Sequence, residues 1–353
     1  MFHDKCGVMG VWNHPSAGHL VYAGLYAIQH RGQESAGITT WTGSNLVTRK
    51  GMGKVMDIFS QEDLSTHLQG DCAIGHTRYS TEGASEVKNA QPLVMELPYG
   101  EVGIAHNGQI TNAVVLKENL KKEGTVFQTS SDTEIILHLL AKQYPLPLEK
   151  ALIEIMDILE GAYSLVLLYK DRVFGVRDPF GFRPLCLGKK EDGFVLASET
   201  CALDLLEADF MRELKPGEVL ALEAGGPRTL QCLNLPQSKF CVFELIYFSR
   251  PDSLFQNKDI LSIRMALGKQ LAREAPAPNA DMVIGIPDSS NPAAIGYAKE
   301  SGLPFELGLI RNHYIGRTFI EPHQSIRLWR GRIKYNPVAR LIHGKSLVVV
   351  DDS

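Results

Sequence analysis

The stretch MVIGIPDSSNPAAIGYA, residues 282–298, indicates an α/β fold for the second part of the chain. Residues 281–286 predict a buried strand, and residues 292–301 predict the helix that follows it. The apolar run SLVVV at 346–350 predicts another buried strand, and residues 260–274 predict a helix before the first one. Strands that alternate with helices in this way favour a parallel sheet.

The first part of the chain has a different pattern, in which short strands are separated by turns. Residues 6–12 predict a strand, and residues 35–41 and 45–50 predict a hairpin. These elements indicate an α+β domain rich in antiparallel pairing. The pattern changes near residues 235–240, after which residues 240–248 predict a strand. We therefore expect a domain boundary there, and we also expect a strand over 303–310 in the second part.

Two helices of the first part have predicted boundaries. Residues 16–32 predict a helix that stops at Gly32, because apolar residues share one face and glycine ends helices. Ser131 and Glu134 have the spacing of a capping box ahead of a helix at 135–142.

The composition excludes several classes of protein. The 353 residues are 44% hydrophobic and 22% charged, which is ordinary for a folded globular chain. No run approaches the ~18 apolar residues that span a membrane, and the first residues lack the apolar centre of a secretory signal. We therefore expect a cytoplasmic protein with no membrane partner. The six cysteines are scattered, without zinc or disulfide spacing.

The net charge of −4 conceals a strongly basic segment. Between Arg311 and Lys345 there are eight lysines and arginines and one acid, Glu321, so this segment carries +7 and the remainder −11. A solvated loop or an anion-binding site would each account for it. We expect no nucleic-acid partner, because the basic residues are not interleaved with stacking aromatic residues.

Polar residues follow both buried strands of the second part. Residues 287–291 read PDSSN, and Asp351 and Asp352 follow the run at 346–350. Open α/β sheets bind ligands at the carboxyl ends of their strands. Hydroxyl and N–H groups at a helix start suit phosphate, and adjacent carboxylates suit ribose hydroxyls or Mg²⁺. Each loop taken alone is equally a helix cap or a polar turn.

Seven short motifs spread along the chain carry a resemblance to a known family. They are QHRGQESAGI (29–38), GHTRYST (75–81), HNGQI (106–110), SSDTE (130–134), IPDSSNPAAIGYA (286–298), RNHYIGRTFIEP (311–322) and VVVDDS (348–353), with Cys6-Gly7-Val8 ahead of them. Together they resemble glutamine phosphoribosylpyrophosphate (PRPP) amidotransferases. The resemblance implies a fold in two parts. Residues 6–238 would form an N-terminal-nucleophile glutaminase, which is an α+β four-layer αββα sandwich. Residues 239–353 would form an α/β type I phosphoribosyltransferase domain, incomplete at its C-terminus.

The resemblance also implies a reaction. Cys6 would attack the side-chain amide of glutamine once a propeptide, residues 1–5, has been removed. A thiolate divides this hydrolysis into two easier steps, and an α-amino group with a pKa of about 7.7–8.0 can act as the base. Ammonia would then displace pyrophosphate from C1 of PRPP and give 5-phosphoribosylamine, the first step of purine nucleotide synthesis. Alternatives are a glutaminase-only fragment, because the chain ends inside the PRPP motif, and a non-catalytic regulatory relative.

Site roles in the glutaminase part follow from the matching positions. The Asn107 side chain and the Gly108 N–H would stabilise the oxyanion. Without the resemblance, Cys6 would be a buried structural thiol, and Asn107-Gly108 would be an ordinary turn. The implied glutamine-binding residues are Arg31, Gly32, Arg78, Thr81 and Asp132. Arg78 would pair with the α-carboxylate and Asp132 with the α-amino group, while Arg31 would shape the surroundings of the nucleophile. A helix C-terminal charge at Arg31 and a first-turn acid at Asp132 are the structural alternatives.

In the transferase part, the implied PRPP-binding residues are Asp288, Ser289, Ser290, Arg311, Tyr314, Arg317, Asp351, Asp352 and Ser353. Mg²⁺ is the expected cofactor, with contacts to Ser289, Asp351 and Asp352, and the basic segment would close over the phosphates. Ser290 stands where the family commonly has glycine. Cys241 matches a position that ligates an iron–sulfur cluster in some members, and one thiol leaves this open. The resemblance further implies a homotetramer and feedback inhibition by purine nucleotides.

Overall fold

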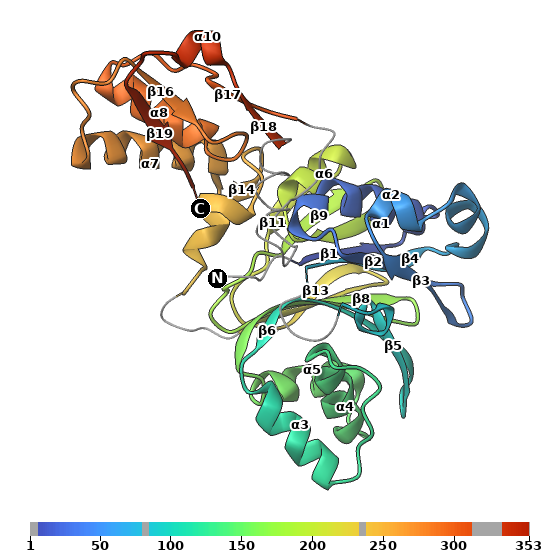
Figure 1. The fold of residues 1–353 in the computed structure, drawn as a ribbon. Coiled ribbons are helices and arrows are strands. Elements are labelled where there is room, and N and C mark those ends of the chain that lie inside the picture. Colours follow the sequence, from blue (N-terminus) through green and yellow to red (C-terminus); the bar gives the residue numbers. More distant parts are fainter. Residues whose placement is uncertain (1–5, 80–84, 233–237, 313–333, 353) are drawn as a thin grey trace. The chain divides into compact units, whose positions relative to one another are not determined.

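The computed structural model describes residues 6–79, 85–232, 238–312 and 334–352. The chain forms two compact units, Met1–Cys241 and Val242–Ser353, and each has a hydrophobic core of its own. In Figure 1 the first unit runs from blue to yellow and the second from yellow-orange to red.

Two antiparallel sheets form the centre of the first unit. In spatial order, the seven-stranded sheet contains β11 (Asp209–Glu213), β9 (Cys186–Lys190), β10 (Gly193–Ala197), β1 (Gly7–Trp12), β4 (Cys72–Arg78), β2 (Ser35–Trp41) and β3 (Leu46–Met52). The six-stranded sheet contains β13 (Gly226–Cys232), β12 (Glu218–Glu223), β8 (Arg172–Arg177), β7 (Gly161–Tyr169), β6 (Gly100–Ile110) and β5 (Leu93–Leu97). The predicted hairpin of the first part is present, because β2 pairs with β3 from Ser35↔Met52 to Trp41↔Leu46.

Helices cover the outer face of each sheet (Figure 1). The helices on the seven-stranded sheet are α1 (Ala17–Ala27), α2 (Val55–Ile58) and α6 (Thr200–Leu205). Those on the six-stranded sheet are α3 (Ala113–Lys122), α4 (Thr133–Lys142) and α5 (Leu148–Met156). Short turns of helix are η1 (Gln29–Arg31), η2 (Asp63–His67) and η3 (Val87–Asn89).

The central strands of both sheets are buried on both faces. Val8 of β1 and Val166 of β7 belong to the cluster of side chains between the sheets. Met9, the next residue of β1, lies in the cluster beneath α1 and α6, and Leu167 lies in the cluster beneath α4 and α5. Because successive strand residues point to opposite faces, a strand between two packed layers needs apolar residues at nearly every position.

The predicted capping box at residues 131–134 is wrong. The Glu134 carboxylate instead accepts hydrogen bonds of 2.7 Å from the N–H groups of Gln128 and Thr129, which precede the helix. Helix α4 begins at Thr133, with Asp132 at its N-cap position. The carboxylate therefore fixes the loop before α4 rather than the first turn of the helix.

The second unit contains a parallel strand pair. Its elements in chain order are η4 (Glu244–Phe248), β14 (Leu254–Phe255), β15 (Lys258–Asp259), α7 (Ile260–Glu274), β16 (Met282–Gly285), α8 (Asn291–Ser301), β17 (Leu309–Arg311), β18 (Tyr335–Pro337), α10 (Ala339–Ile342) and β19 (Leu347–Val350). The parallel pairing predicted from the sequence is confirmed, because β16 pairs with β19 and places Gly285 beside Val350. The predicted strand at 303–310 is shorter than expected, since β17 begins only at Leu309.

The strand predicted at residues 240–248 is wrong. A π-helical turn, η4, occupies Glu244–Phe248. Its helical spacing places Glu244 and Phe248 on one buried face, and the Arg264 guanidinium donates to the Leu245 carbonyl oxygen at 2.9 Å. The aromatic run therefore buries its side chains as a helix, with its backbone bonded to an arginine rather than to a neighbouring strand. Among the described residues, no helix is long and apolar enough to cross a membrane.

Candidate active site

Cys6 lies immediately before β1 and is half-buried. Its Sγ is 3.7 Å from the carbonyl oxygen of Tyr79, and its own carbonyl oxygen accepts a hydrogen bond of 2.8 Å from Nε of Arg31. Gly7 leaves no room for a side chain, because a Cβ atom there would lie 2.7 Å from Cδ1 of Ile28. The backbone that follows the thiol is therefore closely packed.

The motif QHRGQESAGI brings Arg31 and Gly32 beside Cys6. The helix predicted to stop at Gly32 ends earlier, at Ala27, and the turn η1 follows it and carries Arg31. Arg31 is completely buried, and the backbone of Gly32 passes close to β4. A Cβ atom at position 32 would lie 2.6 Å from the carbonyl carbon of Arg78. Arg31 therefore contacts the backbone of Cys6, and Gly32 packs against the end of β4.

Arg78 ends strand β4 and is almost fully buried. Its Nη1 donates to Oε1 of Glu34 at 3.1 Å, and its Cα lies opposite that of Ser35 in the sheet. Arg78 follows Thr77, which pairs with Gly7 of β1, so the register brings the backbone of Arg78 close to that of Cys6. Sequence reasoning missed Glu34, although the motif QHRGQESAGI contains it.

Asn107 and Gly108 lie inside β6, so the alternative of an ordinary Asn-Gly turn is excluded. Asn107 shares a face of β6 with Ala105, which belongs to the same cluster as Val8 between the sheets. The Asn107 side chain is completely buried, and neither its Oδ1 nor its Nδ2 has a hydrogen-bond partner within the described part of the chain. Gly108 has φ +144°, and a Cβ atom there would lie 1.9 Å from the carbonyl oxygen of Ala162.

An unpaired buried amide is costly, and such groups are rare in folded proteins. The Asn107 amide therefore points to a ligand that supplies its missing hydrogen bonds. An oxyanion fits this requirement, because the amide N–H can donate to it.

Asp132, at the N-cap position of α4, lies close to the same strand. Its Oδ2 accepts a hydrogen bond of 2.9 Å from the N–H of Ile110, and its Oδ1 is 3.7 Å from Nδ1 of His106. Burial raises the pKa of this carboxyl, but the neighbouring His106 and the hydrogen bonds outweigh burial and lower the pKa. Asp132 is therefore an ionised carboxylate, suited to an ammonium group.

His76 connects β4, which carries Arg78, with β6, which carries Asn107. It lies on β4, two residues before Arg78, and its Nε2 donates to the carbonyl oxygen of His106 at 2.9 Å. Burial lowers the pKa of His76 to about 3, so the ring is neutral at physiological pH. Its Nδ1 has no partner among the residues that the structure describes. Sequence reasoning missed His76, which lies within the motif GHTRYST.

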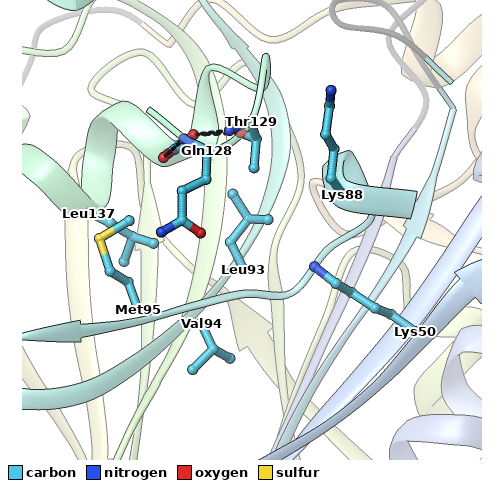
Figure 2. A pocket seen from close by; sticks show the side chains of 9 residues that line it. Lys50, Lys88, Leu93, Val94, Met95, Gln128, Thr129 and Leu137 are labelled. Carbon is cyan, nitrogen blue, oxygen red and sulfur yellow. Dashed lines mark hydrogen bonds between the residues drawn. The ribbon is translucent and has the colours of Figure 1, made fainter. Parts of the chain in front are cut away.

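A cavity of about 260 Å³ lies beside the loop that precedes α4. Figure 2 shows the side chains of Lys50 and Lys88 together on one side of it, and those of Met95 and Leu137 on the other. The Lys50 ammonium donates to a peptide carbonyl at 2.7 Å, and Lys88 pairs with a neighbouring glutamate at 2.6 Å. Both cations therefore already have partners, and we assign this cavity no ligand.

In the second unit, the polar loops that follow β16 and β19 meet. Asp352 follows β19, and its Oδ1 accepts hydrogen bonds from the hydroxyls of Ser289 at 3.0 Å and Ser290 at 2.9 Å. Its Oδ2 is buried and has no partner within the described residues. Burial raises the pKa of Asp352. Ser290 is itself fully buried, and its hydroxyl holds this carboxylate.

The remaining predicted PRPP-binding residues are only partly described. Arg311, at the end of β17, donates to Oδ2 of Asp288 at 2.9 Å, and Asp351 accepts a hydrogen bond of 2.9 Å from the Asp352 N–H. Tyr314, Arg317 and Ser353 lie outside the described residues, as do Thr81 and residues 1–5 in the first unit.

The oxygen atoms of Ser289, Asp351 and Asp352 fit Mg²⁺, which binds few carboxylates and takes further ligands from a phosphate substrate. The unpartnered Oδ2 of Asp352 is the observation that supports this fit. In the described residues, no group of three or more His, Cys, Asp or Glu side chains could hold a metal ion. Cys241 offers one thiol where an iron–sulfur cluster needs four ligands, so the described residues do not fit a cluster.

Comparison with known proteins defines first the class of the site. A family model described as a glutamine amidotransferase domain matches residues 76–205, which include Arg78, Asn107 and Asp132. The first unit therefore contains a glutamine amidotransferase domain.

Relatives over the whole chain define the family. The chloroplastic amidophosphoribosyltransferase 1 of Arabidopsis thaliana is 47% identical over 99% of this chain and 62% of its own length. The amidophosphoribosyltransferase of Methanothermobacter thermautotrophicus is 43% identical over 99% of this chain and 74% of its own length. The solved glutamine PRPP amidotransferase from B. subtilis, complexed with ADP and GMP, superposes with a TM-score of 0.91 at 42% identity, covering 99% of this chain and 75% of that one. This chain belongs to the amidophosphoribosyltransferase family, and it spans about 62% of the length of the Arabidopsis relative.

Proposed function

We propose that this chain hydrolyses glutamine at Cys6 and transfers the ammonia to PRPP, with 5-phosphoribosylamine, pyrophosphate and glutamate as products. This is the first step of purine nucleotide synthesis. The observation that carries the proposal is the buried Asn107 amide, whose Oδ1 and Nδ2 have no partner in the described residues, beside the space-restricted Gly108.

The proposed domain organisation follows the two units. Residues 6–238 would form an N-terminal-nucleophile glutaminase, which is a four-layer αββα sandwich. The presence of two sheets, each covered by helices, supports this layering. Residues 239–353 would form a type I phosphoribosyltransferase domain, supported by the parallel pair β16 and β19 with polar loops at its carboxyl end. Residues 1–5 would be a propeptide, since only an N-terminal Cys6 has the α-amino group that the reaction uses.

In the glutaminase half, the Cys6 thiol would lose its proton to the α-amino group and attack the amide carbon of glutamine. The Asn107 amide and the Gly108 N–H would stabilise the negative oxygen of the tetrahedral intermediate. The proton then passes to the amide nitrogen, the C–N bond breaks and ammonia leaves. Water hydrolyses the remaining thioester, which releases glutamate and restores the thiol.

Two charged residues would bind the amino-acid end of glutamine. Arg78 presents a guanidinium oriented by Glu34, and such a fork suits a carboxylate. Asp132 presents an ionised carboxylate held by the Ile110 N–H, and it suits the α-ammonium group. The opposite charges of the two residues would thus select the zwitterionic end of an amino acid.

In the transferase half, ammonia would attack C1 of PRPP, the bond from C1 to pyrophosphate would break, and a proton would leave the new amine. Asp351 and Asp352 would hold the ribose hydroxyls, while Asp288, Ser289 and Arg311 would face the pyrophosphate. Bound Mg²⁺ would screen the charge of the pyrophosphate.

Regulation and assembly are further parts of the proposal. The B. subtilis relative was solved with ADP and GMP, which supports purine nucleotides as feedback inhibitors of this chain as well. We also propose a homotetramer. We propose no step through an iron–sulfur cluster, because Cys241 alone does not supply its ligands.

One set of measurements tests the proposal. Mass spectrometry of purified protein should find Cys6 as the first residue, and the protein should release glutamate from glutamine and, with PRPP and Mg²⁺, pyrophosphate. Cys6→Ser should abolish glutamate release. Glutamate release without PRPP-dependent pyrophosphate would favour a glutaminase-only chain, and no release from a chain that starts at Cys6 would favour a non-catalytic relative.

A further inference from the structure

Glu199 is a buried carboxylate to which the proposed reaction gives no role. It precedes α6, is 2% exposed, and lies 2.6 Å from Nη1 of Arg31 and 2.8 Å from Nε2 of His30. Burial raises the pKa of Glu199, but the charges of His30 and Arg31 outweigh burial and hold the pKa well below its usual range. A negative charge is therefore fixed beside the arginine that contacts Cys6.

The Arg31 guanidinium connects this charge to the nucleophile. Its Nε donates to the carbonyl oxygen of Cys6 at 2.8 Å, while its Nη1 donates to Glu199. The guanidinium is planar, so fixing one donor fixes the direction of the others. Arg31 is completely buried, and no solvent can take the place of Glu199. The position of the Cys6 carbonyl therefore depends on Glu199.

Ser198, the residue before Glu199, hydrogen-bonds to the backbone of strand β1, which follows Cys6. The Ser198 N–H donates to the carbonyl oxygen of Val8 at 3.1 Å, and the Val8 N–H donates to Oγ of Ser198 at 2.9 Å. Val8 stands two residues after Cys6. Ser198 and Glu199 together thus hold the chain at Cys6 and just beyond it, one directly and the other through Arg31.

From these contacts we infer that Glu199 is a positioning residue for the Cys6 thiol, acting through Arg31. The inference rests on the proposed glutaminase function. Loss of the carboxylate removes the acceptor of Nη1 of Arg31 and the negative charge beside it, so the planar guanidinium shifts and its bond to the Cys6 carbonyl shifts with it. Displacing a nucleophile by about 1 Å can cost on the order of a hundredfold in rate, whereas substrate bound by other residues keeps its affinity.

The test compares Glu199→Gln with a matched control, Glu218→Gln. Glu218 is 1% exposed and accepts two hydrogen bonds from Arg212, at 2.7 and 2.8 Å, on strands β11 and β12. Both substitutions remove one buried carboxylate from an arginine, and both should lower the Tm. A third variant, Glu199→Asp, keeps the buried negative charge but shortens its reach by one methylene.

For glutamine hydrolysis well below the Tm, we expect kcat to fall about ten- to a hundredfold in both Glu199 variants, with KM changed less than about twofold. Glu218→Gln should keep the wild-type kcat. Alkylation of Cys6 by 6-diazo-5-oxo-L-norleucine, an electrophilic glutamine analogue, should slow by the same factor as kcat. A folded Glu199→Asp protein with wild-type kcat would overturn the inference, as would equal losses of kcat in Glu199→Gln and Glu218→Gln.

Failure of the proposed function gives a different result. If the wild-type protein with Cys6 as its first residue neither releases glutamate nor reacts with the glutamine analogue, the glutaminase function fails and the inference fails with it. If the wild type is active and Cys6→Ser is not, but both Glu199 variants keep the wild-type kcat, only the inference fails.

Discussion

Gly32 passes so close to Arg78 that a Cβ atom at position 32 would lie 2.6 Å from the carbonyl carbon of Arg78 and 2.7 Å from its amide nitrogen. All three of the nearest atoms belong to the backbone, so they cannot turn aside as the end of a side chain could. The φ of Gly32 is −159°, which any residue adopts, so the requirement for glycine is one of space alone. The turn η1 and the end of β4 are thereby fitted together beside Cys6.

Gly32→Ala should therefore force the backbone at Arg78 to move. We expect a loss of about 1–3 kcal/mol in the free energy of unfolding, which is typical of overpacking, and a higher KM for glutamine because Arg78 shifts. Urea unfolding and glutamine kinetics measure the two effects. Gly103→Ala is the control, since a Cβ atom there would have ordinary contacts beginning at 3.4 Å. Equal stability of the two variants would contradict the steric role of Gly32.

Asn107→Ala should lower kcat for glutamine hydrolysis and leave the Tm nearly unchanged. Removal of one oxyanion donor typically lowers kcat by about 10²–10³. The Tm should change little, because the Asn107 amide forms no hydrogen bond within the described residues that the substitution could break. Glutamate release and thermal unfolding measure these outcomes.

The control for stability is Asn89→Ala. Asn89 is equally buried, but its Nδ2 donates to Ser130 Oγ at 2.9 Å and its Oδ1 accepts from the Ser130 N–H at 3.0 Å. Its removal leaves these groups unpaired and should cost about 1–3 kcal/mol. If Asn107→Ala proves as destabilising as Asn89→Ala, the Asn107 amide has a structural partner, and its assignment to the oxyanion is wrong.

The strands and the parallel pair could be predicted because their apolar residues leave few other arrangements. Residues such as Val8 and Met9 are buried on opposite faces, and only a strand between two apolar layers permits that. The run at 240–248 has no such alternation, and its apolar residues suit a helix equally well. In that run the helix is held by the buried Arg264, which binds carbonyl groups that precede it by 15 and 19 residues in the sequence.

The residues of the candidate site likewise differ in how far the sequence predicts them. Motifs singled out Cys6, Asn107 and Asp132 as candidates, because each lies within a short, recognisable segment. Glu199 could not be found from the sequence, since its role arises from contacts with residues 168 and 169 positions away. Only the fold brings such supporting residues together, and a single sequence does not show which residues remote from each other in the chain are in contact.

His76 makes the stability of the first unit dependent on pH. Its folded pKa of about 3 lies below the ordinary value of 6.5, so between these values the unfolded chain binds a proton that the folded chain does not. Stability should therefore fall as the pH falls through this range, by about 1.4 kcal/mol for each pH unit from this residue alone. Chemical unfolding of the protein between pH 7 and pH 4 measures the slope.

His76→Gln isolates the contribution of the histidine. The amide N–H of glutamine can replace the donor to the His106 carbonyl oxygen, but glutamine does not titrate. The free energy of unfolding of this variant should depend less steeply on pH than that of the wild type, and the two curves should converge or cross at acid pH. Parallel curves would show that His76 is protonated in the folded protein.

Asp352→Asn should stabilise the second unit and abolish the proposed binding of PRPP with Mg²⁺. Burial raises the pKa of Asp352, so folding is opposed by its charge at neutral pH, and the buried Oδ2 has no partner in the described residues. The variant should raise the Tm by on the order of 2 °C in the absence of ligand. It should also lose the further rise in Tm that PRPP with Mg²⁺ gives the wild type.

Asp281→Asn is the matched control for Asp352. Its hydrogen bond from the Ser346 N–H lowers the pKa of Asp281, so the folded state favours its charge and the substitution should not raise the Tm. The advantage of Asp352→Asn over the wild type should shrink as the pH falls, because the wild-type carboxyl then takes up a proton and loses its charge. A lower Tm for Asp352→Asn at neutral pH would mean that the hydroxyls of Ser289 and Ser290 outweigh the cost of burial. Asp352 would then be a structural anchor for the two loops rather than a group kept unpaired for a ligand.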